Sequence, residues 1–461
     1  MIRPRFSSTL IASAAALLLS ACMSLAPEHK TPAAPVAAAW SHASAGEQSA
    51  AELPWQSFYA ADARLIELIA LALKNNRDLR VALLNVEQAR ALARVADANR
   101  LPTLNAGISA NRQPNTSGGS SNSNYQAGLQ ISAFELDLFG RVKSQSDAVL
   151  ARYLASSEGG RAAKISLVAG VASSYLALQA DQELLLLARQ TLAAREDSLR
   201  LTRMKFDGGA GSALDLSSAE SAAAAARASL AQAKRQREQS ENGLVLLLGQ
   251  PLPSDLAQAR PLAAAQVLEL PSGLPSEVLI KRPDVLQAEQ LLIAANANIG
   301  AARAAFFPSI SLTTSLGTAS NELSQLFSNT VWSLGAQALM PIFDAGRNQA
   351  NLEASKAAQA IAVAQYEKAV QQAFREVADA LAGRATYAEQ TQAQAEQARA
   401  EAERLRLVEL RFANGASNSL ELLDAQRASY AAQQALLQTR LGQLLNNVQL
   451  YKALGGGVSK N

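Results

Sequence analysis

The sequence of 461 residues contains the same pattern twice, separated by a constant offset of 206 residues. The matched positions include Asp78 with Asp284, Pro102 with Pro308, Gly140 with Gly346, Gly209 with Gly415, and Leu214 with Leu420. The register continues to Gly249 and Gly455 without an insertion. Because a period this long indicates one structural unit used twice, both halves are expected to fold alike. The predicted order in each half is a helix, two short strands and two very long helices.

The duplication sets the bounds of the two repeats, and the local sequence sets those of the other expected segments. These are a signal peptide at 1–21, a lipidated tether at 22–60, a first repeat at 61–249, a connector at 250–275, a second repeat at 276–455 and a tail at 456–461. The tether is rich in Pro, Ala and Ser, so an extended segment is expected there. The connector is longer than an ordinary loop, and we expect it to pack outside the helices.

The composition favours long helices over a bulky globular core. Hydrophobic residues make up 49% of the chain and aromatic residues only 5%. The mean hydropathy is nevertheless just +0.01, because alanine supplies much of the apolar count. Such a composition suits helices packed closely along their length. The net charge is +3 and no Lys/Arg block occurs, so nothing in the sequence indicates nucleic-acid binding.

The single cysteine, Cys22, follows a short basic start and the apolar stretch Leu10–Leu19, which is too short to span a bilayer comfortably. The run Leu19-Ser20-Ala21-Cys22 resembles a bacterial lipobox. That resemblance implies that Cys22 is acylated, with palmitate among the chains, and becomes the mature N-terminus. Met23 in place of Asp implies sorting to the outer membrane. The alternative is a chance cysteine in an ordinary signal region.

Helical periodicity runs from Asp62 to about Asn99 and stops before Pro102. Longer helices are predicted at about 142–248 and 346–454, each region being two helices joined by a tight turn. The stretch Val142–Phe206 has no proline and would extend roughly 95 Å at about 1.5 Å per residue. Helices of this length indicate a coiled-coil-like tube.

Four segments alternate apolar with small polar residues and are predicted to be strands, at about 103–112, 124–134, 309–318 and 330–340. A soluble half-buried hairpin would show this pattern. So would a membrane barrel with its apolar face toward lipid, and strands of about 9–11 residues fit a tilted crossing. Four strands cannot close around a lumen, so a barrel must be shared between chains. Two chains would give 8 strands and three would give 12, and only the larger leaves an evident water-filled interior.

Three stretches resemble the TolC-like outer-membrane efflux protein family, in its lipoprotein branch. They are Phe134-Glu135-Leu136-Asp137-Leu138-Phe139-Gly140-Arg141, the region from Lys281-Arg282-Pro283-Asp284-Val285 to Phe306-Phe307-Pro308, and the region from Arg411-Phe412 to Asp424-Ala425-Gln426. With the duplication they cover nearly the whole mature chain. The resemblance implies a mainly α fold with a transmembrane β-barrel: a homotrimer with a 12-stranded barrel continued by a long α-helical barrel in the periplasm. By the same resemblance, the connector is expected to lie in an equatorial region.

The resemblance also implies a function. Such proteins are the exit ducts of tripartite efflux pumps and contribute to multidrug resistance. They conduct substrates passively from an inner-membrane transporter, often of the resistance-nodulation-division class, through a periplasmic adaptor. A lipid-anchored periplasmic adaptor that does not cross the membrane is the alternative, but it predicts one helical hairpin, whereas this sequence predicts two.

The turns between the long helices are the predicted gate and adaptor-docking tip. The residues chosen are Asp207, Gly209, Gly211, Leu214, Gly415, Ser417, Leu420, Glu421 and Asp424. Some relatives have an acidic residue after the second tip glycine, where this chain has Ala416, Ser417 and Asn418, so Asp207, Glu421 or Asp424 would have to form an electrostatic gate. The strand–helix junction residues Pro102, Gly140, Pro308 and Gly346 are predicted to be structural.

Catalytic chemistry is not indicated by the sequence. The two histidines, His29 and His42, both fall in the predicted tether, and no His, Cys and Asp cluster shows ligand spacing. Gly208–Gly211 has neither the preceding strand nor the following Lys-Ser/Thr of a phosphate loop. No nucleophile, base and orienting group occur together. We therefore expect no enzyme activity, no metal and no cofactor apart from the lipid on Cys22.

Overall fold

The computed structural model of the protein describes residues 25–37, 40, 53–114, 121–253, 260–265, 268 and 276–456. They form two compact units. Unit 1 draws on residues up to 34, 84–158 and 286–368, and unit 2 on 35–83, 159–285 and 369 onward. Each unit therefore combines residues from both halves of the sequence.

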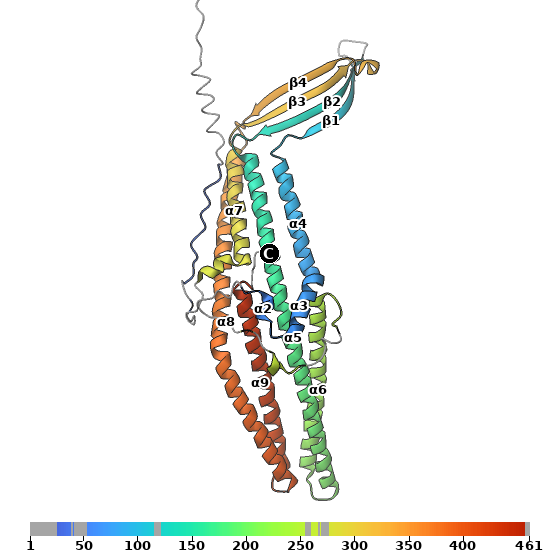
Figure 1. Ribbon diagram of the computed structural model, residues 1–461, viewed down its shortest axis with the longest axis vertical. Helices are drawn as coiled ribbons and strands as arrows, with labels where there is room; N and C mark the ends of the chain where they lie inside the picture. Colours follow the sequence, from blue (N-terminus) through green and yellow to red (C-terminus); the bar gives the residue numbers. More distant parts are fainter. Residues whose placement is uncertain are drawn as a thin grey trace, which may run out of the picture. The chain divides into compact units, whose positions relative to one another are not determined.

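Unit 1 contains an antiparallel sheet with strand order β1-β2-β3-β4 (Figure 1). Its strands are β1 Leu104–Pro114, β2 Ser121–Leu136, β3 Ser309–Ser320 and β4 Thr330–Leu339. β2 extends beyond the predicted 124–134 at both ends. The β2–β3 register shifts between Ile131 and Phe134. Within this shift Ala133 has a φ of 51°, and its N–H donates to Thr313 Oγ1.

The long helices repeat almost residue for residue. α5 spans Arg141–Asp207 and α8 spans Arg347–Ala413, both 67 residues long. α6 Ala213–Leu248 and α9 Ser419–Ala453 are their return helices. α4 Arg77–Ala98 and α7 Pro283–Ala304, which precede the strands, both have 22 residues. Alanines such as Ala219, Ala223 and Ala226 are buried on α6, because a methyl side chain lets helices approach closely.

The helix predicted from Asp62 to Asn99 is two helices, α3 Ala63–Asn75 and α4, separated at Asn76. Asn76 is extended, with a ψ of 130°. Its Oδ1 accepts from Leu79 N–H at 2.8 Å, and its Nδ2 donates to the Leu247 carbonyl on α6 at 2.9 Å. The side chain therefore caps α4 and pairs with α6, and the prediction of one unbroken helix was wrong.

The predicted tether is also wrong in its last residues. α2 Trp55–Phe58 is helical, and Phe58 stacks on Tyr451 of α9 with ring centroids 4.1 Å apart. The Tyr451 hydroxyl donates to the Leu53 carbonyl at 2.7 Å. Further upstream, Trp40 is buried and stacks on Phe374 of α8. Burying an aromatic side chain is worth about 1.5–3 kcal/mol, so these rings fix a segment that its Pro/Ala composition predicts to be loose.

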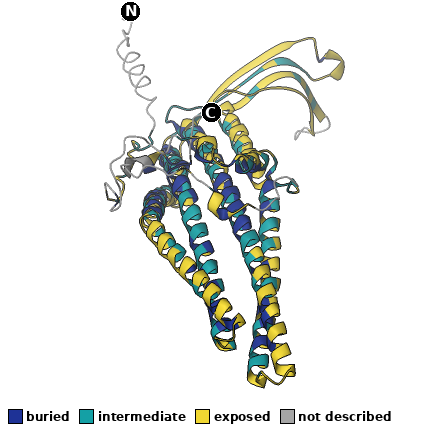
Figure 2. Ribbon diagram, turned by 60° about the horizontal axis from the view of Figure 1, so that its bottom comes forward, coloured by how far each residue is buried: buried dark blue, intermediate teal, exposed yellow. Residues whose placement is uncertain are grey.

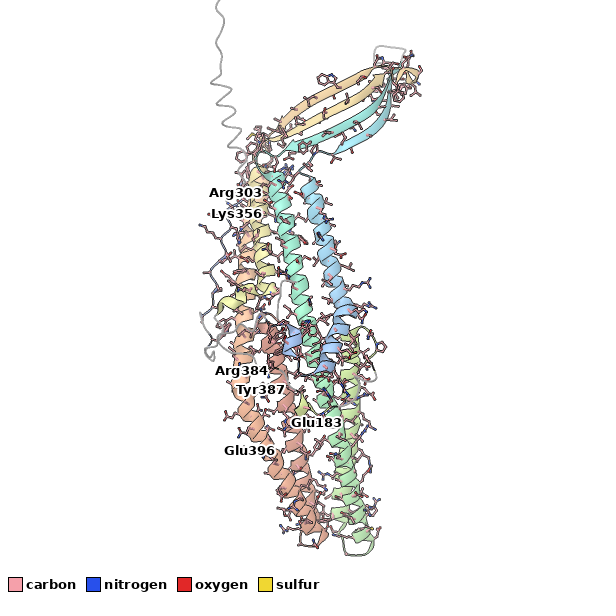
Figure 3. The ribbon with its side chains drawn as sticks, viewed as in Figure 1. Glu183, Arg303, Lys356, Arg384, Tyr387 and Glu396 are labelled. Atoms are coloured by element: carbon pink, nitrogen blue, oxygen red, sulfur yellow. The ribbon has the colours of Figure 1, made fainter. Side chains whose placement is uncertain are left out.

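Earlier tether residues lie along α7 in unit 1. Arg303, labelled in Figure 3, donates to the Leu25 carbonyl at 3.0 Å. Thr31 donates to Glu289 at 2.8 Å. Within 22–60, residues 25–31 therefore contact α7, and the short helix α2 packs on Tyr451 of α9. The tail is described only at Gly456, so 457–461 lie outside the described residues.

Three short 3-10 helices complete the described elements: η2 Leu262–Ala264, η3 Ser276–Lys281 and η4 Leu323–Gln325. In the connector, Leu262 is buried, and its N–H donates to Glu183 of α5 at 3.0 Å. Residues 254–259, 266–267 and 269–275 of the connector lie outside the described residues. The described connector is thus held against the α5–α6 hairpin.

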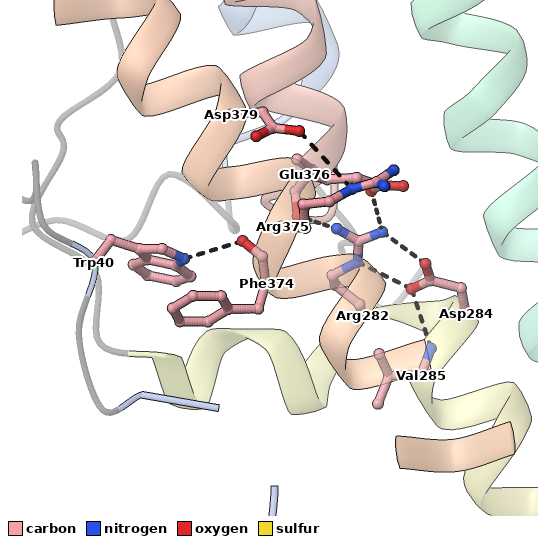
Figure 4. A network of polar contacts seen from close by, with 9 residues as sticks. Trp40, Arg282, Asp284, Val285, Phe374, Arg375, Glu376 and Asp379 are labelled. Atoms are coloured by element: carbon pink, nitrogen blue, oxygen red, sulfur yellow. Dashed lines mark hydrogen bonds and ion pairs between the residues drawn. The ribbon is translucent and has the colours of Figure 1, made fainter. Parts of the chain in front are cut away.

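A buried arginine secures the chain where η3 meets α7 (Figure 4). Arg282 is 6% exposed and donates to Asp284, to Glu376 of α8 at 2.8 Å and to the Ala453 carbonyl of α9 at 2.7 Å. Burial alone lowers the pKa of Arg282, but Asp284 and Glu376 outweigh it and raise that pKa above its ordinary value. The Lys281–Val285 stretch therefore has a structural role inside unit 2.

Candidate functional site

The sheet separates apolar from polar side chains row by row. One row across all four strands pairs Ala106 with Leu129, Leu129 with Leu316, and Leu316 with Trp332. The adjacent row joins Asn105, Gln130, Ser315 and Ser333. Because neighbouring residues of a strand point to opposite faces, these rows lie on opposite sides of the sheet. Of these two rows, one is apolar and the other has uncharged amides and hydroxyls.

The apolar row is not covered within the described chain. Leu316 is 57% exposed and Trp332 is 75% exposed, and the strands are drawn largely as exposed in Figure 2. Hydroxyls on the polar face bond to each other, as Ser315 does with Ser333 at 2.7 Å. A large apolar surface that no part of the described chain covers indicates a partner or a lipid phase.

The sheet also has two free edges among the described residues. β1 pairs only with β2, and β4 pairs only with β3. An unpaired strand edge presents backbone donors and acceptors that cannot remain unsatisfied in hydrocarbon. The edges must pair with further strands if the apolar face contacts lipid.

The junctions from strand to long helix use the residues predicted for them. Gly140 and Gly346 have φ values of 70° and 84°, which favour a residue without Cβ. Asp137 accepts from Val142 N–H and Lys143 N–H at the start of α5, and Asp344 accepts from Asn348 N–H at the start of α8. Pro102 and Pro308 precede β1 and β3 and lie outside the helices. The structural role predicted for these four junction residues stays a prediction.

The two helix tips have the same backbone. Gly209 and Gly415 have φ values of 73° and 75°. In each turn the next N–H bonds back to the helix at 2.8 Å, from Ala210 to Lys205 and from Ala416 to Arg411. This is the pattern of a left-handed C-cap. Ser212 then caps α6 through Asp215 N–H, and Asn418 caps α9 through Glu421 N–H.

An exposed apolar side chain lies beside each turn. Leu214 is 76% exposed and its repeat partner Leu420 is 73% exposed. Gly211 lies so close to the end of α5 that an added Cβ would be 2.9 Å from Phe206 N. The structure thus places the predicted tip residues of both repeats in matching turns, each with an exposed leucine.

The model of the family described as outer membrane efflux protein matches twice, at residues 68–250 and 274–456. The chain belongs to this family. The two matches reproduce the duplication, and together they span most of the sequence.

Relatives of this outer membrane efflux protein align with it over nearly its whole length. It is 46% identical to the probable efflux pump outer membrane protein TtgC of Pseudomonas putida, over 98% of this chain and 96% of that one. It is also 46% identical to outer membrane protein OprJ of Pseudomonas aeruginosa, over 96% of this chain and 94% of that one.

Among solved structures, the open state of the MtrE outer membrane channel of Neisseria gonorrhoeae matches with a TM-score of 0.87 and 42% identity. It covers 95% of this chain and 99% of that one. These likenesses confirm the predicted fold, a TolC-like outer-membrane efflux channel that is mainly α with a small antiparallel sheet. They favour the channel over the adaptor alternative.

The acidic tip residues of this efflux protein are mostly compensated by nearby arginines. Asp424 pairs with Arg427 at 2.5 Å and with Arg404 at 3.4 Å, and these hydrogen bonds lower its pKa. Glu421 accepts from Ser417 at 2.5 Å and pairs with Arg411 at 3.4 Å. Asp207 forms no ion pair with any residue that the structure describes. The structure therefore brings Ser417 and Glu421 together and pairs both Glu421 and Asp424 with arginines.

Sequence reasoning missed Asp215, which links the two tips. It accepts from Ser212 at 2.6 Å and from Ser419 of the other hairpin. Hydrogen bonds from Ser212 and then Ser419 lower the pKa of Asp215. The Ser212-x-x-Asp215 spacing is a helix-capping signal that points to this residue. Its link to the second hairpin depends on Ser419, which the repeat does not duplicate because the matching residue is Ala213.

The predicted lipidation site Cys22 lies outside the described residues, as does His42 of the predicted tether. His29 is described, and its Nδ1 lies 3.1 Å from Asn296 Nδ2 on α7. Within the described ranges no three His, Cys, Asp or Glu side chains are grouped as metal ligands. One described helix, α5, is long and apolar enough to span a membrane, but half of its apolar window is buried inside the fold, as in a core helix.

Proposed function

We propose that this protein is the outer-membrane exit duct of a tripartite efflux pump. Three copies would close a 12-stranded barrel by pairing β1 of one copy with β4 of the next, which satisfies both free edges. The apolar row would face lipid and the amide and hydroxyl row would face the water-filled interior. The alternation of these two rows is the observation that supports the proposal most.

In this proposal the long helices of three copies form the periplasmic tunnel, and the chain conducts substrates passively without catalysing a reaction. Its partners would be a periplasmic adaptor and an inner-membrane transporter of the resistance-nodulation-division class. Two of its relatives are named for pump components that export toluene or antibiotics. The adaptor would dock at the tips, where Leu214 and Leu420 offer two similar exposed anchors per copy.

Cys22 is proposed to be acylated after removal of residues 1–21. Several acyl chains on one residue would anchor the N-terminus firmly, since each buried methylene contributes about 0.8 kcal/mol. The described residues that follow, from Leu25 onward, lie along α7. Mass spectrometry of the mature protein is expected to show a lipid-modified Cys22, and an unmodified cysteine there rejects this part of the proposal.

The barrel is tested by extraction and crosslinking of intact membranes. An integral trimer is expected to remain in the membrane in urea and to crosslink to three copies. Release of the protein by urea contradicts the barrel and favours a peripheral protein. Recovery of monomers alone after crosslinking does the same.

Docking is tested with crosslinkable cysteines at Leu214 and Leu420 in cells that also produce a pump adaptor. Leu246 is a matched control, because it is 77% exposed on α6 and lies far along the helix from the turn. We expect adaptor adducts from both tip positions and none from Leu246. Equal labelling at all three positions would argue against a tip contact.

An electrostatic gate is proposed at the same tips. Replacing Asp207, Glu421 and Asp424 together by alanine is expected to change single-channel conductance, because Arg411 and Arg427 then lose the carboxylates that pair with them. An unchanged conductance would show that the gate is steric.

A further inference from the structure

A crevice of about 410 Å³ lies within unit 2, between α5, α6 and α9. Its wall on α6 is made of small residues on one helix face. These are Ser218, Ser221, Ala222, Ala225, Ala226 and Ser229. The opposite wall includes Asp424, Arg427 and Tyr430 of α9, and Thr191 and Arg195 of α5 line the remainder. The crevice is thus bordered by hydroxyls, by two guanidinium groups and by the Asp424 carboxylate, which pairs with Arg427 and Arg404.

Arg195 is the unusual group in this crevice. It is 8% exposed, and its Nη1 donates to the Leu423 carbonyl at 3.3 Å. That is its one hydrogen bond to a described residue. Burial lowers the pKa of Arg195, and the nearby charge of Arg427 lowers it further. A buried cation normally has an anionic partner, because an uncompensated charge is costly to remove from water.

The carboxylates nearest along the chain are already paired elsewhere. Glu196 pairs with Arg227 at 3.2 Å, and Asp197 pairs with Arg200 at 3.5 Å. Asp424 is shared between Arg404 and Arg427. Arg195 therefore has no carboxylate partner among the described residues.

We propose that the crevice binds a small oxyanion, a carboxylate or an inorganic phosphate, between Arg195 and Arg427. A guanidinium group matches the oxygens of either anion in a two-point hydrogen bond. The hydroxyls of Thr191, Ser218 and Ser221 line the same space and can donate to the remaining oxygens. A volume of about 410 Å³ falls within the usual range of small-ligand sites, roughly 300–1,000 Å³.

Occupancy has a mechanical consequence. Arg195 belongs to the first helical hairpin, whereas Arg427 and the Leu423 carbonyl belong to α9 of the second. An anion held by both arginines joins the hairpins and removes the repulsion between two cations. The bound anion therefore holds α5 and α9 together near the tips.

The test is a calorimetric titration of the full-length protein, purified in detergent, with inorganic phosphate in one series and acetate in another. One saturable site per chain is expected with at least one of the two anions. The anion that binds more tightly identifies the ligand class as phosphate or carboxylate. Arg195→Met is expected to weaken binding by about tenfold or more, which corresponds to about 1.4 kcal/mol. Arg200→Met is the matched control, since Arg200 lies on the same helix, is 63% exposed and is expected to bind like wild type.

A second variant separates loss of the site from loss of folding. Ala225→Leu adds bulk to the α6 wall at an exposed position while Arg195 stays in place, so it is expected to abolish binding with the thermal midpoint unchanged. Arg195→Met is expected to have a thermal midpoint no lower than wild type without anion, because it removes an unpaired buried charge. Absence of saturable binding by wild type, or equal binding by wild type and Arg195→Met, overturns the proposal.

Discussion

At the scale of single residues, buried charges affect folding and binding more than exposed charges do. Arg282 and Arg195 are both almost fully buried, yet Arg282 has two carboxylates and a carbonyl while Arg195 has one carbonyl. The first locks the chain between α8 and α9, and the second leaves a charge open to a ligand. Neither difference is visible in the sequence, where each arginine is simply one of many along a helix or its start.

Arg282→Met is expected to lower the free energy of unfolding by about 3–5 kcal/mol, because Asp284 and Glu376 lose the cation that compensates them. Arg375→Met is the control, since its pair with Asp379 is 74% exposed on both sides and such pairs contribute about 0–1 kcal/mol. Urea unfolding followed by helical circular dichroism measures both. Equal losses of unfolding free energy in the two variants would mean that the buried network stabilises the fold no more than the exposed pair does.

The tip carboxylate Asp215 gives a pH-dependent prediction. Its pKa is lowered in the folded state, so the charged form stabilises the fold. This contribution is present above the unfolded aspartate pKa of about 3.9 and is lost as pH falls through the lower folded value. Asp215→Asn is expected to have a lower thermal midpoint than wild type at neutral pH, with the difference vanishing in acid. A difference that persists below the folded pKa would assign the effect to shape and not to charge.

At the scale of elements, the sheet depends on close backbone approach at its centre. Gly128 of β2 faces Gly317 of β3, and a Cβ added to Gly128 would lie 2.5 Å from the Leu316 carbonyl oxygen. Gly335 of β4 has its nearest such neighbour, the Thr313 carbonyl, at 3.9 Å. The two glycines therefore differ in what a methyl group would meet.

Gly128→Ala is expected to reduce the folded protein recovered in the outer-membrane fraction several-fold, because the β2–β3 backbones must separate. Gly335→Ala is expected to be recovered like wild type. Quantitative immunoblotting of membrane fractions compares them. Similar recovery of both variants would indicate that the sheet relaxes around the added methyl group.

The elements that could be predicted are those encoded locally. The 206-residue repeat and the alternating strands indicate α5, α8 and the four strands, and the glycines indicate the tips. The break at Asn76 could not be predicted, because it depends on the Leu247 carbonyl 171 residues away. The packing of Leu53 depends on Tyr451, 398 residues away. Arg195 escaped notice for the same reason, since a helical arginine among polar residues resembles a solvated one.

At the scale of the whole molecule, the two faces of the sheet are expected to differ in how well they tolerate an introduced charge. Leu316 and Ser315 are neighbours on the central strand β3 and belong to the apolar and polar rows. Leu316→Arg is expected to cost about 2–4 kcal/mol if that row faces the bilayer, whereas Ser315→Arg is expected to be tolerated. Urea-dependent folding into lipid vesicles measures the difference. The reverse order of the two variants would mean that the apolar row faces inward.

The row of Asn105, Gln130, Ser315 and Ser333 has one more consequence, because none of its members bears a formal charge. A wall lined by such groups attracts neither sign of ion in preference to the other. Under a potassium chloride gradient across a planar bilayer, this row should add little permselectivity, and any sizeable reversal potential would have to originate at charged groups elsewhere in the chain.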